Sequence, residues 1–301
     1  MTDGKSLEEL RHDIDRIDDA IQELLWQRSA IVEKVRAYKL TQRVFRRGGF
    51  FRPGREAEIL RRLVRRHRGR FPKLGLVQVW RAIVASHLAH QEHFSLAVYR
   101  PKLKNACWEL AREQYGPLVP MVAESSVAAV LRKVSERSAS AGVLPLPKKK
   151  DEAWWRHLVG RFADLRIVAG LPFANFESEK GEVEALIVAP MPAEHTGKDR
   201  SFLAIESNGG ISAVRLATAL AQEKIRGRSV LAWRSSARSS RSFSLIEVEG
   251  FFGEDAPILN RVRTRLGRSV RRIAVVGSYA VPLHGAKGKR NRKSPRGQSK
   301  S

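Results

Sequence analysis

A long amphipathic segment near the N-terminus constrains the fold of this chain more than any other feature. From Leu7 to Lys39, apolar residues recur with the spacing of an α-helix and, at about 100° per residue, fall in one stripe. The stripe contains Leu10, Ile14, Ile17, Ile21, Leu24, Val32 and Val35. Ser6 and Glu9 have the spacing of a capping box, which predicts the start of the helix. A helix of this length is too long to be covered by the other helices of a small bundle in one chain. We therefore expect it to pair with a second copy of itself.

Two strongly hydrated cations, Arg28 and Lys39, lie in the middle of this apolar stripe. A buried charge without a partner costs several kcal/mol or more, so each cation needs a counterion. They are separated by about 16 Å along the helix axis and by about 20° around it, which allows two long side chains to hold a small anion between them. Arg11 lies about 100° away at the edge of the stripe, where it could serve a neighbouring chain. The alternative is pairing across a dimer with Asp15, Asp18 or Glu23.

The sequence predicts a multidomain chain, all-α at its N-terminus and α/β or α+β afterwards. Residues 5–95 read as three helices, with a second start at Arg52-Pro53-Gly54 and a third helix over 74–93. Residues 96–195 alternate strands and helices, as in an open α/β layer. Residues 200–284 have the order strand, helix, strand, strand, helix, strand, which is typical of a ferredoxin-like module. Residues 285–301 are basic and polar, so we expect a disordered tail.

The net charge of +25 has two sources, the basic tail and the arginine clusters of 43–55 and 61–70. Such clusters attract phosphate backbones and small dianions alike, so charge alone does not identify the partner. The start of the chain is polar and no apolar run approaches about 18 residues, so we expect a cytoplasmic protein without a membrane segment. The only cysteine, Cys107, excludes an internal disulfide, and its neighbours indicate a buried side chain.

Three stretches carry a resemblance to a known family: "LRHDIDRIDDAIQELLWQRSAIVEKVRAYK", "RPGREAEILRRL" and "VWRAIVASHLAHQ". Together they make residues 5–95 resemble the all-helical chorismate mutases, which occur alone or at the front of bifunctional chorismate mutase/prephenate dehydratases. The resemblance implies an intertwined homodimer that converts chorismate to prephenate without a metal or cofactor. The resemblance also implies which residues form the site: Arg11, donated by the other subunit, together with Arg28, Lys39, Arg55, Glu56 and Gln91.

The pericyclic reaction of chorismate explains why the family uses these residue types. The substrate is a dicarboxylate that needs no nucleophile, so the protein holds the reactive chair and stabilises developing charge. By the resemblance, Arg11 and Arg28 bind the two carboxylates, each with bidentate hydrogen bonds. Lys39 and Gln91 donate to the ether oxygen, which gains negative charge as its C–O bond breaks. The substrate is then the counterion of the cations in the stripe.

Glu56 would accept a hydrogen bond from the ring hydroxyl of the substrate, with Arg55 orienting the carboxylate. Two positions depart from the family pattern, because many relatives have an aspartate where this chain has Arg52 and a serine where it has His87. Both are peripheral substrate contacts, and a cationic His87 is one replacement for the serine. We therefore expect the departures to alter affinity more than activity.

The rest of the chain resembles the other modules of the bifunctional enzymes more faintly. Residues 96–195 are similar to one lobe of a prephenate dehydratase, but Val183-Glu184-Ala185 stand where the family has its catalytic Thr-Arg-Phe, so we expect no dehydratase activity. Residues 200–284 are similar to a regulatory ACT domain. Its "ESRP" segment, which helps bind phenylalanine, corresponds here to "LAWRSS" of 231–236.

Other functions remain open from the sequence alone. The chain fits a non-catalytic protein that senses chorismate or prephenate, or a basic nucleic-acid-binding protein, although nucleic acid is the less favoured partner. Related helical proteins release pyruvate from isochorismate, so that activity is a second alternative. His87, His90 and His93 are spaced by three and spread around their helix, which argues against a metal site. "ESNGGIS" and "VVGSY" indicate isolated glycine turns rather than a nucleotide loop.

Overall fold

The computed structural model describes residues 5–41, 49–92, 94–102, 105–148, 150–234 and 241–285, without the side chains of 91–92, 150–152, 229–230 and 233–234. Most of the basic tail, 286–301, and part of the "LAWRSS" segment, 235–236, therefore lie outside the described residues. None of the helices in the described ranges is long and apolar enough to cross a membrane.

The three predicted helices are present as α1 (Leu7–Thr41), α2 (Pro53–Arg66) and α3 (Lys73–Glu92). The capping box forms as expected. The Ser6 backbone N–H donates to Glu9 Oε2 at 2.6 Å, and the Glu9 N–H donates to Ser6 Oγ at 3.2 Å. These bonds lower the pKa of the Glu9 carboxyl. Pro53 occupies the first turn of α2, where its missing N–H costs nothing.

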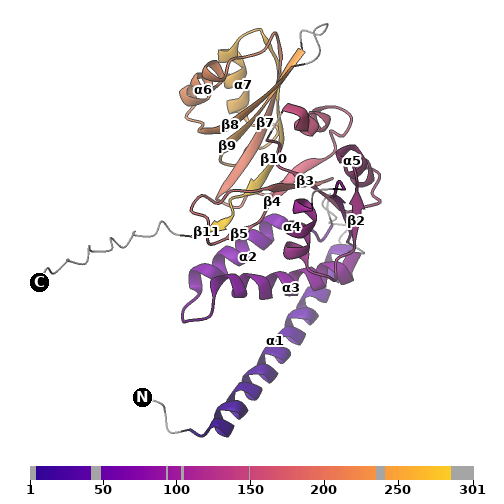
Figure 1. Cartoon of the computed structure of the whole chain (residues 1–301), viewed down its shortest axis with the longest axis vertical. Coiled ribbons are helices and arrows are strands. Elements are labelled where there is room, and N and C mark those ends of the chain that lie inside the picture. Colours follow the sequence, from indigo (N-terminus) through magenta and orange to yellow (C-terminus); the bar gives the residue numbers. More distant parts are fainter. Residues whose placement is uncertain are drawn as a thin grey trace, which may run out of the picture.

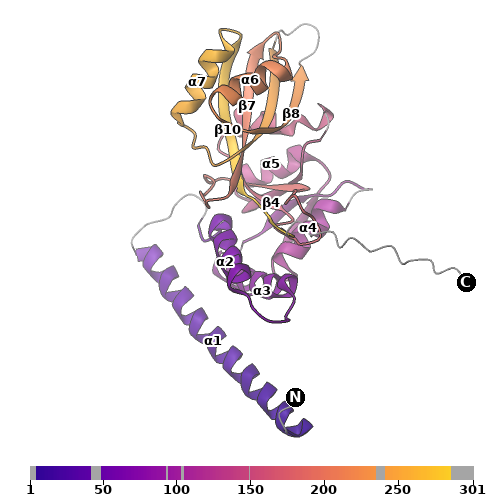
Figure 2. The ribbon, with the colours of Figure 1, turned by 90° about the vertical axis from the view of Figure 1, so that its left-hand side faces the viewer.

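The long helix α1 projects away from the rest of the molecule, as Figures 1 and 2 show. Its apolar stripe is uncovered within one chain: Leu10 is 47% exposed, Ile17 56% and Leu24 62%. Burying one such side chain stabilises a folded protein by about 1.5–3 kcal/mol, so covering the whole stripe would contribute a large stabilisation. The apolar stripe of α1 is therefore exposed to solvent in a single chain.

Helices α2 and α3, unlike α1, share their core with the α/β part of the chain. Phe51, Ala85 and Leu88 belong to one buried cluster with strand residues, and Leu60 and Val77 belong to another. Arg61 of α2 also caps carbonyl groups of the α/β part. The residues of 5–95 therefore divide physically into an extended helix and a docked helical pair.

A nine-stranded mixed sheet forms the body, in the order β2-β1-β3-β6-β4-β10-β7-β9-β8 (Figures 1 and 2). Its strands are β1 (Leu96–Tyr99), β2 (Met121–Glu124), β3 (Ala141–Pro145), β4 (Arg166–Leu171), β6 (Ala185–Ala189), β7 (Asp199–Asn208), β8 (Gly227–Arg234), β9 (Arg241–Glu249) and β10 (Val270–Ala280). Four helices accompany it: α4 (Ala106–Tyr115), α5 (Val127–Ser135), α6 (Ala213–Gln222) and α7 (Pro257–Leu266). The strand and helix alternation predicted after Phe94 is confirmed.

The C-terminal strands adopt the ferredoxin-like order β10-β7-β9-β8 and are antiparallel to one another. The sheet is continuous with the preceding lobe, because β10 pairs with β4 at Gly277 and Ile167. The glycine turn expected at "VVGSY" is wrong: Gly277 lies inside β10 with φ 144°, at an irregularity in the strand register. A Cβ there would lie 2.1 Å from the Ile167 carbonyl oxygen, which explains the glycine.

Two small features were not predicted. A 3₁₀ segment, η1 (Lys150–Val159), buries Trp155 against the sheet. Two-residue strands β5 (Ala174–Asn175) and β11 (Leu283–His284) pair in parallel and pack against α2 and α3. Both depend on contacts between distant segments and have no local periodicity.

Candidate active site beside the long helix

A cavity of about 430 Å³ lies between α1, the segment before α2, α2 itself and α3. Its polar lining contains six of the eight predicted site residues: Arg28, Lys39, Arg52, Arg55, Glu56 and His87. The apolar lining consists of Val32, Val35, Phe50, Phe51, Ile59, Val84 and Leu88. The volume suits a small organic molecule, and the walls combine apolar surface with several cations and one carboxyl group.

The two stripe cations of α1 both line this cavity. Burial lowers the pKa of the partly buried Arg28 guanidinium. Lys39 Nζ lies 4.7 Å from the centroid of the Phe50 ring, within cation–π range. Both side chains are thus held on apolar surface at the edge of a space that an anion can enter.

His87 of α3 lies beside Arg28. Its Nδ1 lies 2.7 Å from the Ile83 carbonyl oxygen, which requires the proton on Nδ1. Arg28 Nη1 lies 3.2 Å from His87 Nδ1 and 3.5 Å from His87 Nε2, and the Ser29 hydroxyl lies 3.0 Å from Nε2. His87 therefore links α3 to α1 at the wall of the cavity.

The pair at the start of α2 has unexpected partners from a distant segment. Arg52 donates through Nε to Glu194 Oε1, and the Arg55 backbone N–H lies 3.3 Å from Glu194 Oε2. The Arg55 guanidinium donates to Glu58 at 2.9 Å. The expectation that Arg55 orients Glu56 is therefore corrected. An i, i+3 ion pair on the exposed helix face takes that guanidinium instead.

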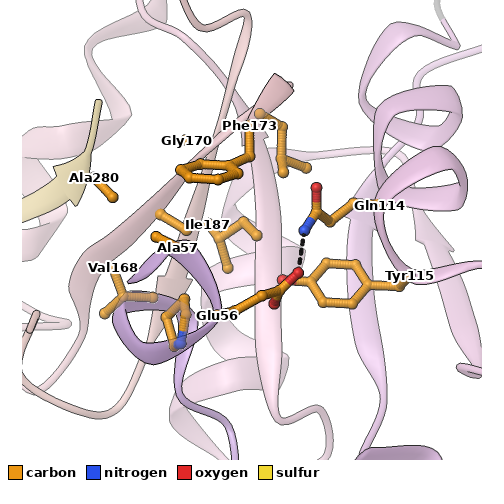
Figure 3. Close-up of a pocket in the computed structure, with 12 residues that line it drawn as sticks. Glu56, Ala57, Gln114, Tyr115, Val168, Gly170, Phe173, Ile187 and Ala280 are labelled. Atoms are coloured by element: carbon orange, nitrogen blue, oxygen red, sulfur yellow. Dashed lines mark hydrogen bonds between the residues drawn. The ribbon is translucent and has the colours of Figure 1, made fainter. Parts of the chain in front are cut away.

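The carboxyl group of Glu56 points toward the interface between α2 and the α/β part (Figure 3). Its Oε1 accepts a hydrogen bond from Gln114 Nε2 of α4 at 2.8 Å. Burial raises the pKa of Glu56 to about 7, against the opposing effects of Arg81 and of the Gln114 hydrogen bond. Glu56 lines both the 430 Å³ cavity and a smaller one, of about 20 Å³, between α2, α4 and the sheet. Glu56 thus contributes to the walls of both cavities, while its carboxyl is bonded on the α4 side.

Two predicted residues are not placed in this cavity. Arg11 is near the far end of α1, 17 residues and therefore about 25 Å along the axis from Arg28. Gln91 lies in α3, but its side chain is outside the described residues. Among the described residues, no group of three or more His, Cys, Asp or Glu side chains is placed to hold a metal ion.

The sequence did not indicate Gln114, Arg81 or Glu194 as part of the site. Gln114 and Arg81 are each more than nine-tenths buried, and Glu194 follows the last strand of the lobe before β7. Their contacts depend on tertiary packing, for which helix or strand periodicity contains no signal.

Residues 10–92 match the sequence model of the family described as chorismate mutase type II. The matched residues cover most of α1 and all of α2 and α3, and a mixed α/β region follows them in the same chain.

Over a longer stretch the chain is similar to bifunctional chorismate mutase/prephenate dehydratases. It is 28% identical to that of Aquifex aeolicus over 146 residues, 47% of this chain and 39% of the relative. It is 26% identical to that of Pseudomonas aeruginosa over 155 residues, 51% of this chain and 42% of the relative. The matched part thus spans about two fifths of each relative.

Among solved structures, the prephenate dehydratase of Streptococcus mutans aligns with 13% identity and a TM-score of 0.45. The alignment covers 63% of this chain and 99% of that one.

Proposed function

We propose that this chain is a homodimeric chorismate mutase that converts chorismate to prephenate. The observation that supports this most is the cavity beside α1, where the two stripe cations and Glu56 line one space of about 430 Å³. The match of residues 10–92 to the chorismate mutase type II family supports the same activity.

The lining of the cavity suits a reaction without covalent chemistry. Arg28 would bind one carboxylate of chorismate, and Lys39 would donate to the ether oxygen as the C–O bond breaks. Glu56, in its ionised form, would accept a hydrogen bond from the ring hydroxyl. Holding the reactive chair between these groups lowers the entropic part of the barrier.

The second carboxylate would be bound by Arg11 of a second copy. Arg11 is about 25 Å along α1 from Arg28, so it cannot complete its own cavity, but an antiparallel α1 from a second chain would place it there. The exposed apolar stripe of α1 supports such pairing, because it would be buried in the dimer. Gln91 would be a second donor to the ether oxygen.

We further propose that the α/β part lacks prephenate dehydratase activity. Val183 is buried at the position where the family has its catalytic threonine, and Glu184 replaces the arginine. The chain then supplies neither the hydroxyl nor the guanidinium that the dehydratase reaction uses. A phenylpyruvate product formed from prephenate at neutral pH would contradict this proposal.

The test is product analysis with the purified full chain. Chorismate should disappear with formation of prephenate, identified by acid conversion to phenylpyruvate. Lys39→Ala should abolish the reaction, whereas Lys34→Ala, on the same helix outside the cavity, should not.

The same assay separates the alternatives. Pyruvate released from isochorismate, without turnover of chorismate, would identify the lyase reaction instead. Binding of chorismate without any product would identify a sensor.

A further inference from the structure

We infer that Gln114, in α4 of the α/β part, is a positioning residue for Glu56 of the mutase site. This inference rests on the proposed function. It means that the α/β part, and not the helical domain alone, sets the orientation of the Glu56 carboxyl.

The contact that carries the inference is short and buried. Gln114 Nε2 lies 2.8 Å from Glu56 Oε1, and Gln114 is only 6% exposed (Figure 3). The neighbouring arginine in α2, Arg55, uses its guanidinium for Glu58. The orienting bond of Glu56 therefore comes from another part of the fold.

Gln114 is suited to hold the carboxyl in either protonation state. Its Nε2 donates to the carboxylate, whereas its Oε1 is buried and has no hydrogen-bond partner among the described residues. A rotation of the amide by 180° would present Oε1 to a protonated Glu56, which then donates. The amide can thus satisfy the acid and its conjugate base without moving α4.

Charged and titratable groups surround this pair from two helices. Arg81 of α3 is 3% exposed, its Nη1 lies 3.5 Å from Glu113 Oε1, and its charge also attracts Glu56. Tyr115 of α4 is buried beside the carboxyl, and burial together with Glu56 raises its pKa well above the usual range. The sheet contributes apolar contacts from Val168 and Ile187. The ionisation of Glu56 therefore depends on Gln114 directly and on Glu113 through Arg81.

These two neighbours have opposite effects, which gives a sharp test. Gln114→Met preserves volume but removes the donor, so the ionised form of Glu56 loses a stabilising bond and its pKa rises. Glu113→Gln removes a competitor for Arg81, so the attraction of Arg81 for Glu56 grows and its pKa falls. A purely structural role for α4 would impair both variants in the same direction.

The experiment measures kcat/KM for chorismate against pH in the full-length chain. The wild type should show a limb near pH 7, rising with pH as Glu56 ionises. In Gln114→Met this limb should move up by about 1 pH unit, which lowers the rate at pH 7 about fivefold and restores it near pH 9. In Glu113→Gln the limb should move to lower pH. Gln222→Leu, an exposed site on α6, is the control and should keep the wild-type profile.

Each outcome has a defined meaning. If the wild type forms no prephenate, the proposed function fails. If the wild type is active but Gln114→Met keeps its pH limb, or both α4 variants lose activity equally at all pH values, the inference about Gln114 is overturned. Should Gln114→Met fail to fold, Gln114→Glu keeps the shape and a polar group, and must also shift the limb upward.

Discussion

The clearest physical consequence of the Glu56 environment is a pH-dependent cost to stability. The pKa of this carboxyl is about 7 in the folded chain, against a reference value of 4.5. The unfolded state therefore loses its proton at lower pH than the folded state does. Between these two values the folded state binds more protons, so the free energy of unfolding falls as pH rises through this window.

The magnitude follows from the difference between the two pKa values. The two pKa values differ by about 2.5 units, and each unit corresponds to about 1.36 kcal/mol. The ionisation of Glu56 therefore lowers the free energy of unfolding by at most about 3.4 kcal/mol, a limit reached above about pH 8. At pH 5.5 about 1.4 kcal/mol of this cost is already present, so about 2 kcal/mol separates pH 5.5 from pH 8. Glu56→Gln cannot ionise, and its amide could donate to the orphan Oε1 of Gln114.

The assay is urea unfolding of the wild type and Glu56→Gln at pH 5.5 and pH 8, at one protein concentration. The variant should gain about 1–2 kcal/mol relative to the wild type between the two pH values, while its mutase rate at pH 8 falls. All other titrating groups are shared and cancel in the comparison. Parallel pH profiles of stability would refute the raised pKa and the buried state of this carboxyl.

Three further predictions concern the long helix and the single cysteine. In sedimentation velocity, Ile17→Lys should sediment as a monomer, because it places a charge in the exposed apolar stripe. Asp19→Lys, on the opposite face of α1, should remain a dimer. If both variants are dimers, pairing through the stripe is contradicted. An equal mixture of inactive Arg11→Ala and Arg28→Ala chains should recover about a quarter of the wild-type rate after subunit exchange, because half of the dimers then carry one intact site. No recovery would place Arg11 outside the partner's site. Burial raises the pKa of the Cys107 thiol to about 11, so an aromatic disulfide reagent at pH 8 should label it only upon unfolding, and rapid labelling of native protein would disprove that environment.

Local chemistry made much of the fold predictable from the sequence. The capping box at Ser6, the proline at the start of α2 and the ferredoxin-like order of the last strands depend on short-range patterns, and all three are present. The stripe cations of α1 could be identified because a charge on an apolar helix face needs an explanation.

Contacts between segments that are far apart in the sequence were not predictable in the same way. Gln114 bonds Glu56 across 58 residues, and Arg52 pairs with Glu194 across 142. An amide in a short helix and a glutamate after a strand look the same whether they face solvent or another domain. The docking of α2 and α3 onto the sheet therefore had no signature in periodicity, capping or composition. The boundaries of residues 5–95, 96–195 and 200–284 as separate folding units remain a proposal.

Calorimetric titration with a bicyclic oxa-dicarboxylate that mimics the rearranging chair tests the central claim most directly, since that claim makes the substrate the counterion of the cations on α1. The wild type should bind one mimic per chain, and Arg28→Ala should weaken the affinity by about 100-fold, as expected for loss of a charged bidentate contact. Equal affinity in both proteins, or no binding to the wild type, would contradict the assignment of this cavity to a dicarboxylate.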